Sequence, residues 1–141
     1  MGTLKENIKK ILKEGFDELD WMKSNSIDAK ELMDLLIQTK ATSIPFEVVD
    51  GDLYLKRTAI KSLGNLQSVG GGLYLEGTAI ESLGNLQSVG GDLYLRRTAI
   101  KSLGNLQSVG GDLNLRGTPL AKAYSEEEIR QMVEVGGNIY L

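Results

Sequence analysis

A block of 20 residues occurs three times in succession, and this repeat constrains the fold more than any other feature of the chain. The copies read GDLYLKRTAIKSLGNLQSVG (51–70), GGLYLEGTAIESLGNLQSVG (71–90) and GDLYLRRTAIKSLGNLQSVG (91–110). A repeat of fixed length indicates stacked equal units, because one unit this short cannot bury its apolar face alone. We therefore expect each copy to form one rung of a solenoid.

The array extends beyond the three full copies at both ends. A fourth copy begins as GDLNLRGTPL (111–120), departs, and returns as GGNIYL at 136–141. The segment upstream of residue 51 keeps the apolar order of the repeat, with one residue deleted, at Ile44, Phe46 and Val49. The array is therefore expected to begin before residue 51.

Each rung is predicted to be mainly β. Leu53, Tyr54 and Leu55 alternate as strand residues do, which places both leucines in the core and the tyrosine outside. Twenty residues are too few for a helix and a strand of ordinary length, so the rest of the rung should be extended or 3₁₀-like. Corners are expected near Arg57-Thr58, near Gly64-Asn65 and at the Gly-Gly pair, where we expect positive φ.

In-register rungs bring every twentieth residue together, so like charges at one position would repel. Two positions change sign in the middle copy, reading Lys56, Glu76, Arg96 and Lys61, Glu81, Lys101. Each acid would then lie between two bases, which favours stacking. The hydroxyls of a threonine column are expected to bond to adjacent rungs; its members are Thr58, Thr78, Thr98 and Thr118.

Both ends carry helix signals. Residues 1–40 are predicted to form a helical N-terminal cap, with helices starting at the capping boxes Thr3 to Glu6 and Asp28 to Glu31. Residues 41–141 are predicted to form the solenoid, with a helix inserted at about 125–135 that starts at the capping box of Ser125 and packs through Ile129, Met132 and Val133. The two parts are expected to make one folded unit.

The last strand of the array, which ends at Leu141, leaves its outer edge without an evident partner. Such an edge can pair with a second copy of the chain. One hypothesis is therefore a homodimer through the C-terminal strand edge.

The phrase SLGNLQSVGGDLYLRRTAIKSLGNLQSVGG resembles the receptor L-domain, a right-handed β-helix related to leucine-rich repeats. The resemblance covers about 44–120 and implies a leucine-rich-repeat-like, single-handed coil of short strands with a ligand-facing sheet. The chain lacks the cysteines of that family, so hormone binding is not implied. The repeats also resemble those of small bacterial and phage-encoded proteins of leucine-rich character.

Composition excludes several function classes. The chain has 141 residues, no cysteine and no histidine, which removes disulfides, thiolate chemistry and the commonest metal ligand and general base. The net charge of −3 argues against nucleic acid as the main ligand. No apolar run is long enough for a signal peptide or a membrane span, so a cytoplasmic location is expected.

No cofactor or metal site is predicted, and no enzyme activity. VGGGLYLEG (69–77) lacks the long helix that follows a dinucleotide fingerprint, and the DGD of residues 50–52 lacks the further acids of a calcium loop. Near-identical rungs also offer no unique, asymmetric pocket.

The strand word is the segment GDLYLK of residues 51–56 and its equivalent in each copy, and its outward residues are the predicted partner-binding site. Tyrosine and arginine contribute heavily to protein interfaces. An alternative surface is the acidic N-terminal cap around Trp21. The proposed partner-binding residues are Tyr54, Tyr74, Tyr94, Tyr140, Asp92, Arg96 and Trp21.

These residues favour a non-catalytic module that binds another protein. One alternative is carbohydrate binding, in which the tyrosines would stack on sugar rings. A third hypothesis, based on size and acidity, is that the protein is a small inhibitor of a host enzyme. One form of this hypothesis is that a phage encodes the inhibitor. The tyrosine column could equally be structural, because stacked side chains stabilise neighbouring strands.

Overall fold

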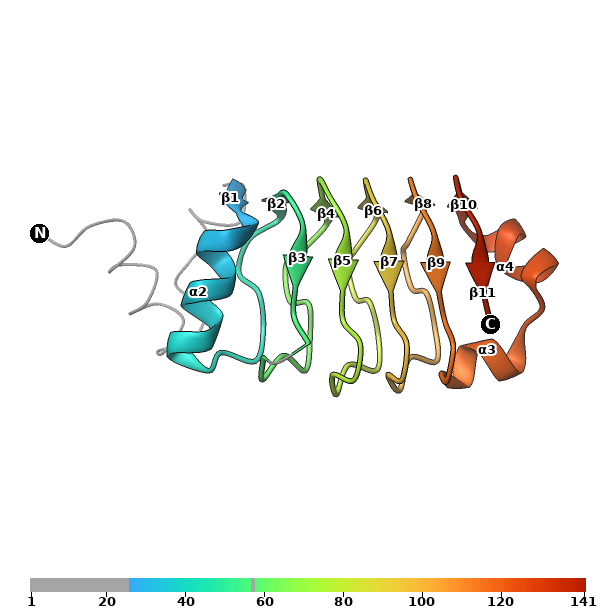
Figure 1. Ribbon diagram of the computed structural model, residues 1–141, viewed down its shortest axis with the longest axis horizontal. Coiled ribbons are helices and arrows are strands. Elements are labelled where there is room, and N and C mark those ends of the chain that lie inside the picture. Colours follow the sequence, from blue (N-terminus) through green and yellow to red (C-terminus); the bar gives the residue numbers. More distant parts are fainter. Residues whose placement is uncertain (1–25, 57) are drawn as a thin grey trace, which may run out of the picture.

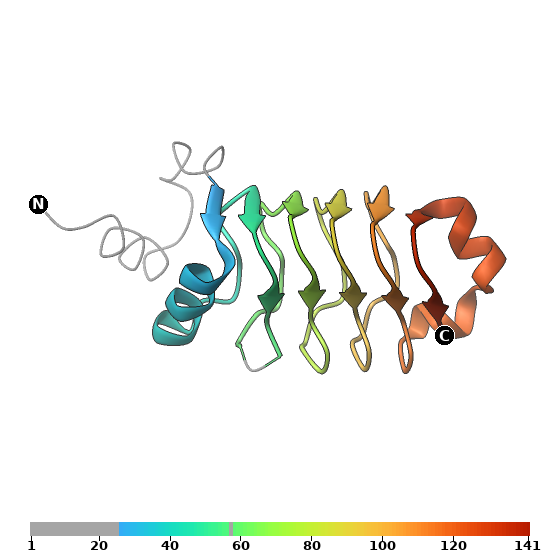
Figure 2. The same cartoon turned by 45° about the horizontal axis from the view of Figure 1, so that its top comes forward.

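The computed structural model describes residues 26–56 and 58–141. Short parallel strands form two stacked sheets, with helices at the ends (Figures 1 and 2). Sheet A has the order β1-β2-β4-β6-β8-β10, and sheet B the order β11-β9-β7-β5-β3. Sheet A contains β1 (Ser26–Asp28), β2 (Val48–Asp50), β4 (Ser68–Val69), β6 (Ser88–Val89), β8 (Ser108–Val109) and β10 (Glu134–Val135). Sheet B contains β3 (Leu53–Tyr54), β5 (Leu73–Tyr74), β7 (Leu93–Tyr94), β9 (Leu113–Asn114) and β11 (Ile139–Tyr140).

The register of the sheets follows the sequence repeat. In the middle of the array the paired residues are 20 positions apart, as in Ser68 with Ser88 and Leu73 with Leu93. At the ends the spacing is larger because helices are inserted, and Leu113 pairs with Ile139. Parallel strands in two sheets with few helices are compatible with a β-solenoid-like repeat.

The core lies between the two sheets. Leu53 and Leu55 are fully buried while Tyr54 is half exposed, so the predicted direction of the strand side chains is confirmed. The upstream half-copy joins the same core, since Ile44, Phe46 and Val49 are buried. Each full copy buries the same six apolar side chains, which in the second copy are Leu73, Leu75, Ile80, Leu83, Leu86 and Val89.

The predicted corners are present in the second and third copies, but the reason given for the Gly-Gly corner is wrong. Gly90 and Gly110 do not have positive φ, whereas Gly64, Gly84 and Gly104, in the turns on the other side of the rungs, have φ of 57°, 55° and 57°. A Cβ on Gly90 would overlap the carbonyl oxygen of Gly70, and one on Gly110 would overlap that of Gly90. The corner glycines are therefore required by close contact between rungs.

The threonine column is also used differently from the prediction. Thr78 Oγ1 donates a hydrogen bond to the carbonyl oxygen of Leu75 at 2.8 Å, and Thr98 Oγ1 donates to Leu95 at 2.7 Å. Both acceptors lie three residues back in the same copy. The hydroxyls therefore close the turn after each sheet B strand, and they do not connect adjacent rungs.

Of the two charge columns, one forms an ion pair. Lys56 Nζ lies 3.2 Å from Glu76 Oε1, as alternating charges in stacked rungs predict. At the second position, no ion pair involves Glu81 within the part of the chain that the structure describes.

At the N-terminal end, α2 (Ala29–Thr39) begins where the sequence predicts it. Asp28 is the N-cap, and its side chain accepts from the backbone N–H groups of Lys30 and Glu31. Strand β1 immediately before it was not predicted; it extends sheet A by pairing with β2. The other predicted helices of the cap lie outside the described residues.

At the C-terminal end, α3 (Pro119–Ala123) and α4 (Glu126–Met132) separate β9 from β10. Helix α4 has the predicted capping box between Ser125 and Glu128, but it ends at Met132, and residues 134–135 form a strand. Ile129 and Val133 are buried as predicted. The prediction for Met132 is wrong, because this side chain is 45% exposed.

Candidate interaction surface

The outer face of sheet B carries three parallel columns of side chains, because the same three positions of each strand word point outward and pair in register. The tyrosine column lies in the centre. The acidic border precedes it along each strand, and the basic border follows it. The tyrosine column is Tyr54, Tyr74, Tyr94, Asn114 and Tyr140; the acidic border is Asp52, Asp92 and Asp112; the basic border is Lys56, Arg96 and Arg116, with Glu76 among them.

The predicted alignment of the tyrosines is confirmed. The ring centroids of Tyr54 and Tyr74 are 4.5 Å apart with 7° between the planes, and those of Tyr74 and Tyr94 are 5.0 Å apart with a tilt of 32°. The ring of Tyr74 is therefore covered on both faces by its neighbours. What the column offers to solvent is ring edges and hydroxyl groups.

Stacking also changes the acidity of the phenols. Burial raises the pKa of Tyr74 to about 12, with further contributions from Tyr54 and from the carboxylates of Asp92 and Asp52. The pKa of Tyr94 is raised too, first by burial and then by Asp92 and Asp112. Both hydroxyls therefore stay protonated near neutral pH and are able to donate hydrogen bonds.

The acidic border has a structural role that the sequence reasoning missed. Asp52 Oδ1 accepts from the backbone N–H of Gly72 at 2.7 Å, and Asp92 Oδ1 accepts from that of Asp112 at 2.7 Å. Asp112 Oδ1 accepts from Asn138 N at 2.8 Å. Each carboxylate thus joins its own rung to the next one. Asp92, predicted to bind a partner, has one oxygen engaged in this way.

The basic border differs along the array. Glu76 neutralises Lys56 at the start, whereas no carboxylate among the described residues lies within 4.0 Å of Arg96 or Arg116. The guanidinium of Arg116 lies 4.8 Å from the centre of the Tyr140 ring, in a cation–π contact. The structure thus brings Arg96 and Tyr140 onto the same face as the tyrosine stack, with Asn114 interrupting the aromatic column.

Trp21, the remaining predicted partner-binding residue, lies outside the described residues, as does the acidic segment beside it. The alternative surface around it stays a prediction.

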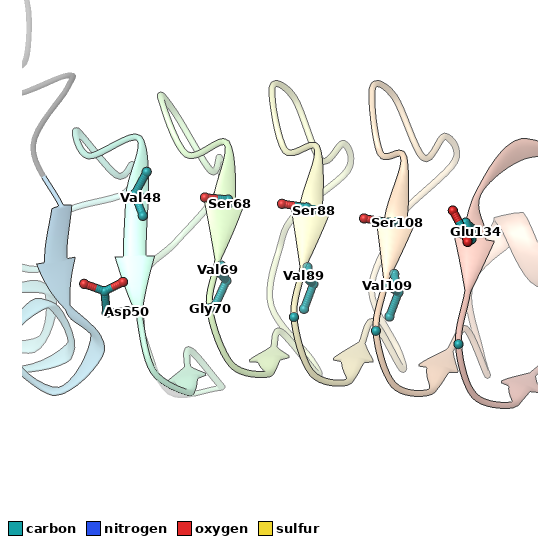
Figure 3. A pocket seen from close by; sticks show the side chains of 13 residues that line it. Val48, Asp50, Ser68, Val69, Gly70, Ser88, Val89, Ser108, Val109 and Glu134 are labelled. Atoms are coloured by element: carbon teal, nitrogen blue, oxygen red, sulfur yellow. The ribbon is translucent and has the colours of Figure 1, made fainter.

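A second surface, which the sequence reasoning did not select, lies over sheet A (Figure 3). An open groove of about 550 Å³ runs across the strands over Ser68, Ser88 and Ser108. Asp50 lies near one end of this groove and Glu134 near the other. The sequence feature that could have indicated this groove is the serine of the repeated segment QSVGG. Its lining is mostly small side chains, and no aromatic residue contributes to it.

Arg130 covers part of the last rung. It donates hydrogen bonds to the carbonyl oxygens of Val135 and Gly137 at 3.2 and 3.0 Å, and it pairs with Glu126 at 3.1 Å. Val135 is the last residue of β10, the final strand of sheet A, and Gly137 lies two residues beyond it. A charged side chain at this place protects a sheet edge from pairing with another chain.

Comparison of the chain with protein-family models, curated protein sequences and solved structures finds no match. Within residues 26–56 and 58–141, no group of three or more His, Cys, Asp or Glu side chains is placed to bind a metal ion. None of the described helices combines the length and apolar character needed to cross a membrane.

Proposed function

We propose that this protein is a non-catalytic interaction module whose tyrosine column binds another protein. In this proposal the scaffold is a right-handed β-solenoid of 20-residue rungs, similar to leucine-rich repeats, which presents sheet B as a flat recognition face. A rigid, repeated scaffold suits recognition of an extended surface, since it holds each side chain at a fixed spacing.

The observation that supports this proposal best is the exposure of the stacked tyrosines beside the arginines of the basic border. Tyr54 is 50% exposed, and the basic border next to the column carries Arg96 and Arg116 without a carboxylate partner among the described residues. Tyrosine and arginine are the residue types most enriched at binding hot spots. A purely structural tyrosine column would not require an arginine border.

The ring geometry favours a protein partner over a carbohydrate. Sugar rings stack on an open aromatic face, but Tyr74 has a neighbouring ring 4.5 Å away on one side and another 5.0 Å away on the other. Ring edges and hydroxyl groups remain for contact, and these suit the polar and apolar mixture of a protein surface. The hypothesis of an enzyme inhibitor is compatible with the same face.

The test compares wild-type protein with a Tyr74→Ala, Tyr94→Ala variant in a pull-down followed by mass spectrometry and by binding of the purified partner. A matched control is Gln87→Ala, Gln107→Ala, because both glutamines are exposed and lie away from sheet B. We expect the tyrosine variant to lose the partner and the control to keep it. A partner retained equally by all three proteins would refute the proposal.

A further inference from the structure

We propose that the partner of the tyrosine column is a second copy of this chain, docked face to face about a two-fold axis parallel to the direction in which the strands stack. This inference rests on the proposed function, since it uses the same face. It is carried by the order of charges on that face, which is complementary to itself.

The charges form the same pattern in three of the five rungs and a different one in the second rung. Asp52, Asp92 and Asp112 on the acidic border each share a strand word with a base on the other border, namely Lys56, Arg96 and Arg116. In the second rung both positions change together. The acid is replaced by Gly72, and the base is replaced by Glu76.

A two-fold axis parallel to the stacking direction keeps the order of the rungs and reverses the direction of the strands. Each rung then faces the same rung of the other copy. The acidic border of one copy lies over the basic border of the other, and the tyrosine column lies over itself. Asp92 would face Arg96 of the second copy, while Gly72 would face Glu76 without charge repulsion. Such an isologous contact is the commonest way in which identical chains pair.

Within one copy, the ion pair with Lys56 accounts for Glu76, but no contact links that change to the loss of the acid at Gly72. The two positions are four residues apart on a strand, or about 13 Å, which is too far for a direct contact. The ring of Tyr74 occupies the space above Gly72, since a Cβ there would lie 2.7 Å from Tyr74 Oη. However, Tyr54 and Tyr94 stand beside Asp52 and Asp92, so a tyrosine at this place does not require glycine.

The groups needed for these contacts remain available. Asp52, Asp92 and Asp112 each use Oδ1 for the next rung, so the second carboxylate oxygen is not engaged in that contact. In Asp92 this second oxygen also lies 3.5 Å from the hydroxyl of Tyr94. Arg96 and Arg116 have no carboxylate within 4.0 Å among the described residues.

The size of the face sets the expected strength of the dimer. Five strands spaced about 4.8 Å apart and about six residues wide give roughly 500 Å² for each copy. The total of roughly 1,000 Å² is at the lower limit for a specific interface. We therefore expect a weak dimer that dissociates on dilution through the micromolar range, and more readily at high salt.

The first test follows dimer dissociation by sedimentation equilibrium over a dilution series. Arg96→Glu, Arg116→Glu should weaken the dimer at least about tenfold, because each glutamate would face an aspartate of the other copy. The matched control Lys61→Glu, Lys101→Glu makes the same change in net charge at two exposed lysines of the other charge column, away from sheet B. We expect this control to dimerise as the wild type does.

The second test uses the absence of cysteine from the chain. A single Asn114→Cys substitution in the tyrosine column lies on the proposed axis, so a short bismaleimide should crosslink this cysteine to the same cysteine of the second copy. Ser88→Cys, on the outer face of sheet A, should not crosslink. Circular dichroism checks that the variants remain folded.

The outcomes separate this inference from the function proposed above. A chain that stays monomeric at high concentration, or a dimer that resists Arg96→Glu, Arg116→Glu, would overturn the face-to-face dimer. A resistant dimer would point to the C-terminal strand edge. In either case, loss of a different protein partner from the tyrosine variant would still support the interaction module.

Discussion

At the residue scale, the glycines of the repeat serve two separate purposes. The corner glycines allow two backbones to touch, since a Cβ on Gly90 would overlap the carbonyl oxygen of Gly70. The turn glycines provide a left-handed backbone, and Gly84 does so in open space, with a φ of 55° and no atom within 4 Å of where its Cβ would be. The sequence shows equal conservation of both between copies and does not distinguish them.

Substitution should separate the two purposes. We predict that Gly90→Ala lowers the free energy of unfolding by at least about 2 kcal/mol, because neither backbone is able to move away. Gly84→Asn should cost less than about 1 kcal/mol, since asparagine tolerates the left-handed region. Urea denaturation monitored by circular dichroism measures both. Equal losses at the two positions would contradict this distinction.

Arg97 occupies a position at which two other rungs have glycine. Its φ is 60°, and Gly77 and Gly117 at the equivalent positions have φ of 70° and 75°. A left-handed conformation costs a residue with a Cβ about 1–2 kcal/mol. Replacement by glycine removes this cost, but it also gives the unfolded chain more entropy, which costs about 0.5–1 kcal/mol of stability. Arg97→Gly is therefore predicted to stabilise the protein by about 0.5–1 kcal/mol.

The reverse change provides the control for this prediction. Gly77→Arg introduces the same strain where nothing lies within 4 Å of the Cβ, so it should destabilise by a similar amount. Both variants are compared with wild type by urea denaturation. A loss of stability in Arg97→Gly would show that the arginine side chain contributes more than its backbone costs.

At the element scale, the tyrosine column couples the stability of sheet B to alkaline pH. The pKa of Tyr74 is about 12 in the folded protein, mainly through burial, and that of an unfolded tyrosine is about 10. Above pH 10 the unfolded chain loses this proton while the folded chain keeps it. The unfolded state then binds fewer protons, so stability falls as pH rises from about 10 to about 12.

This prediction is checked by urea denaturation at several pH values between 9 and about 11.5, with Tyr74→Phe as the control. Phenylalanine keeps the ring stack but has no proton to lose, so the variant should lose less stability over the same interval. Absorbance of tyrosinate at high pH should show one fewer late-titrating group. An identical pH dependence in both proteins would contradict the assignment to Tyr74.

Most elements with a local signal, either a side-chain cap or the alternating leucines of sheet B, could be predicted from the sequence, whereas strand β1 could not. Asp28 and Ser125 mark the starts of α2 and α4 because their side chains accept backbone N–H groups nearby. Strand β1 has only three residues and exists through its pairing with β2. Helix α3 was missed although Thr118 and Pro119 are an N-cap and first-turn signal.

At the scale of the whole molecule, the repeat length predicts which residues become neighbours but not which atoms meet. Tyr54 and Tyr74 stack as a spacing of 20 residues requires. The same spacing placed Asp52 next to Gly72 but gave no sign that the carboxylate accepts the glycine N–H. Backbone donors are invisible in a sequence, so the candidate face was predictable as a surface and its hydrogen bonds were not.

A final prediction tests the proposed 20-residue rung by removing one. Deleting residues 71–90 joins Gly70 to Gly91 and leaves Leu93 to pair with Leu53, so the protein should fold with a stack shortened by about 4.8 Å. Deleting residues 71–80 removes half a rung, so the chain would pass from sheet A to the wrong part of the next copy. That variant is expected to unfold.

Circular dichroism and small-angle X-ray scattering measure folding and length for both deletions. The 20-residue deletion should be somewhat less stable than wild type, because it removes Glu76 and sets Lys56 beside Arg96. Adding Arg96→Glu to the deletion restores an acid next to Lys56 and should recover part of that loss. If both deletions unfold alike, the rungs do not act as interchangeable units, and the solenoid in the proposed function fails with them.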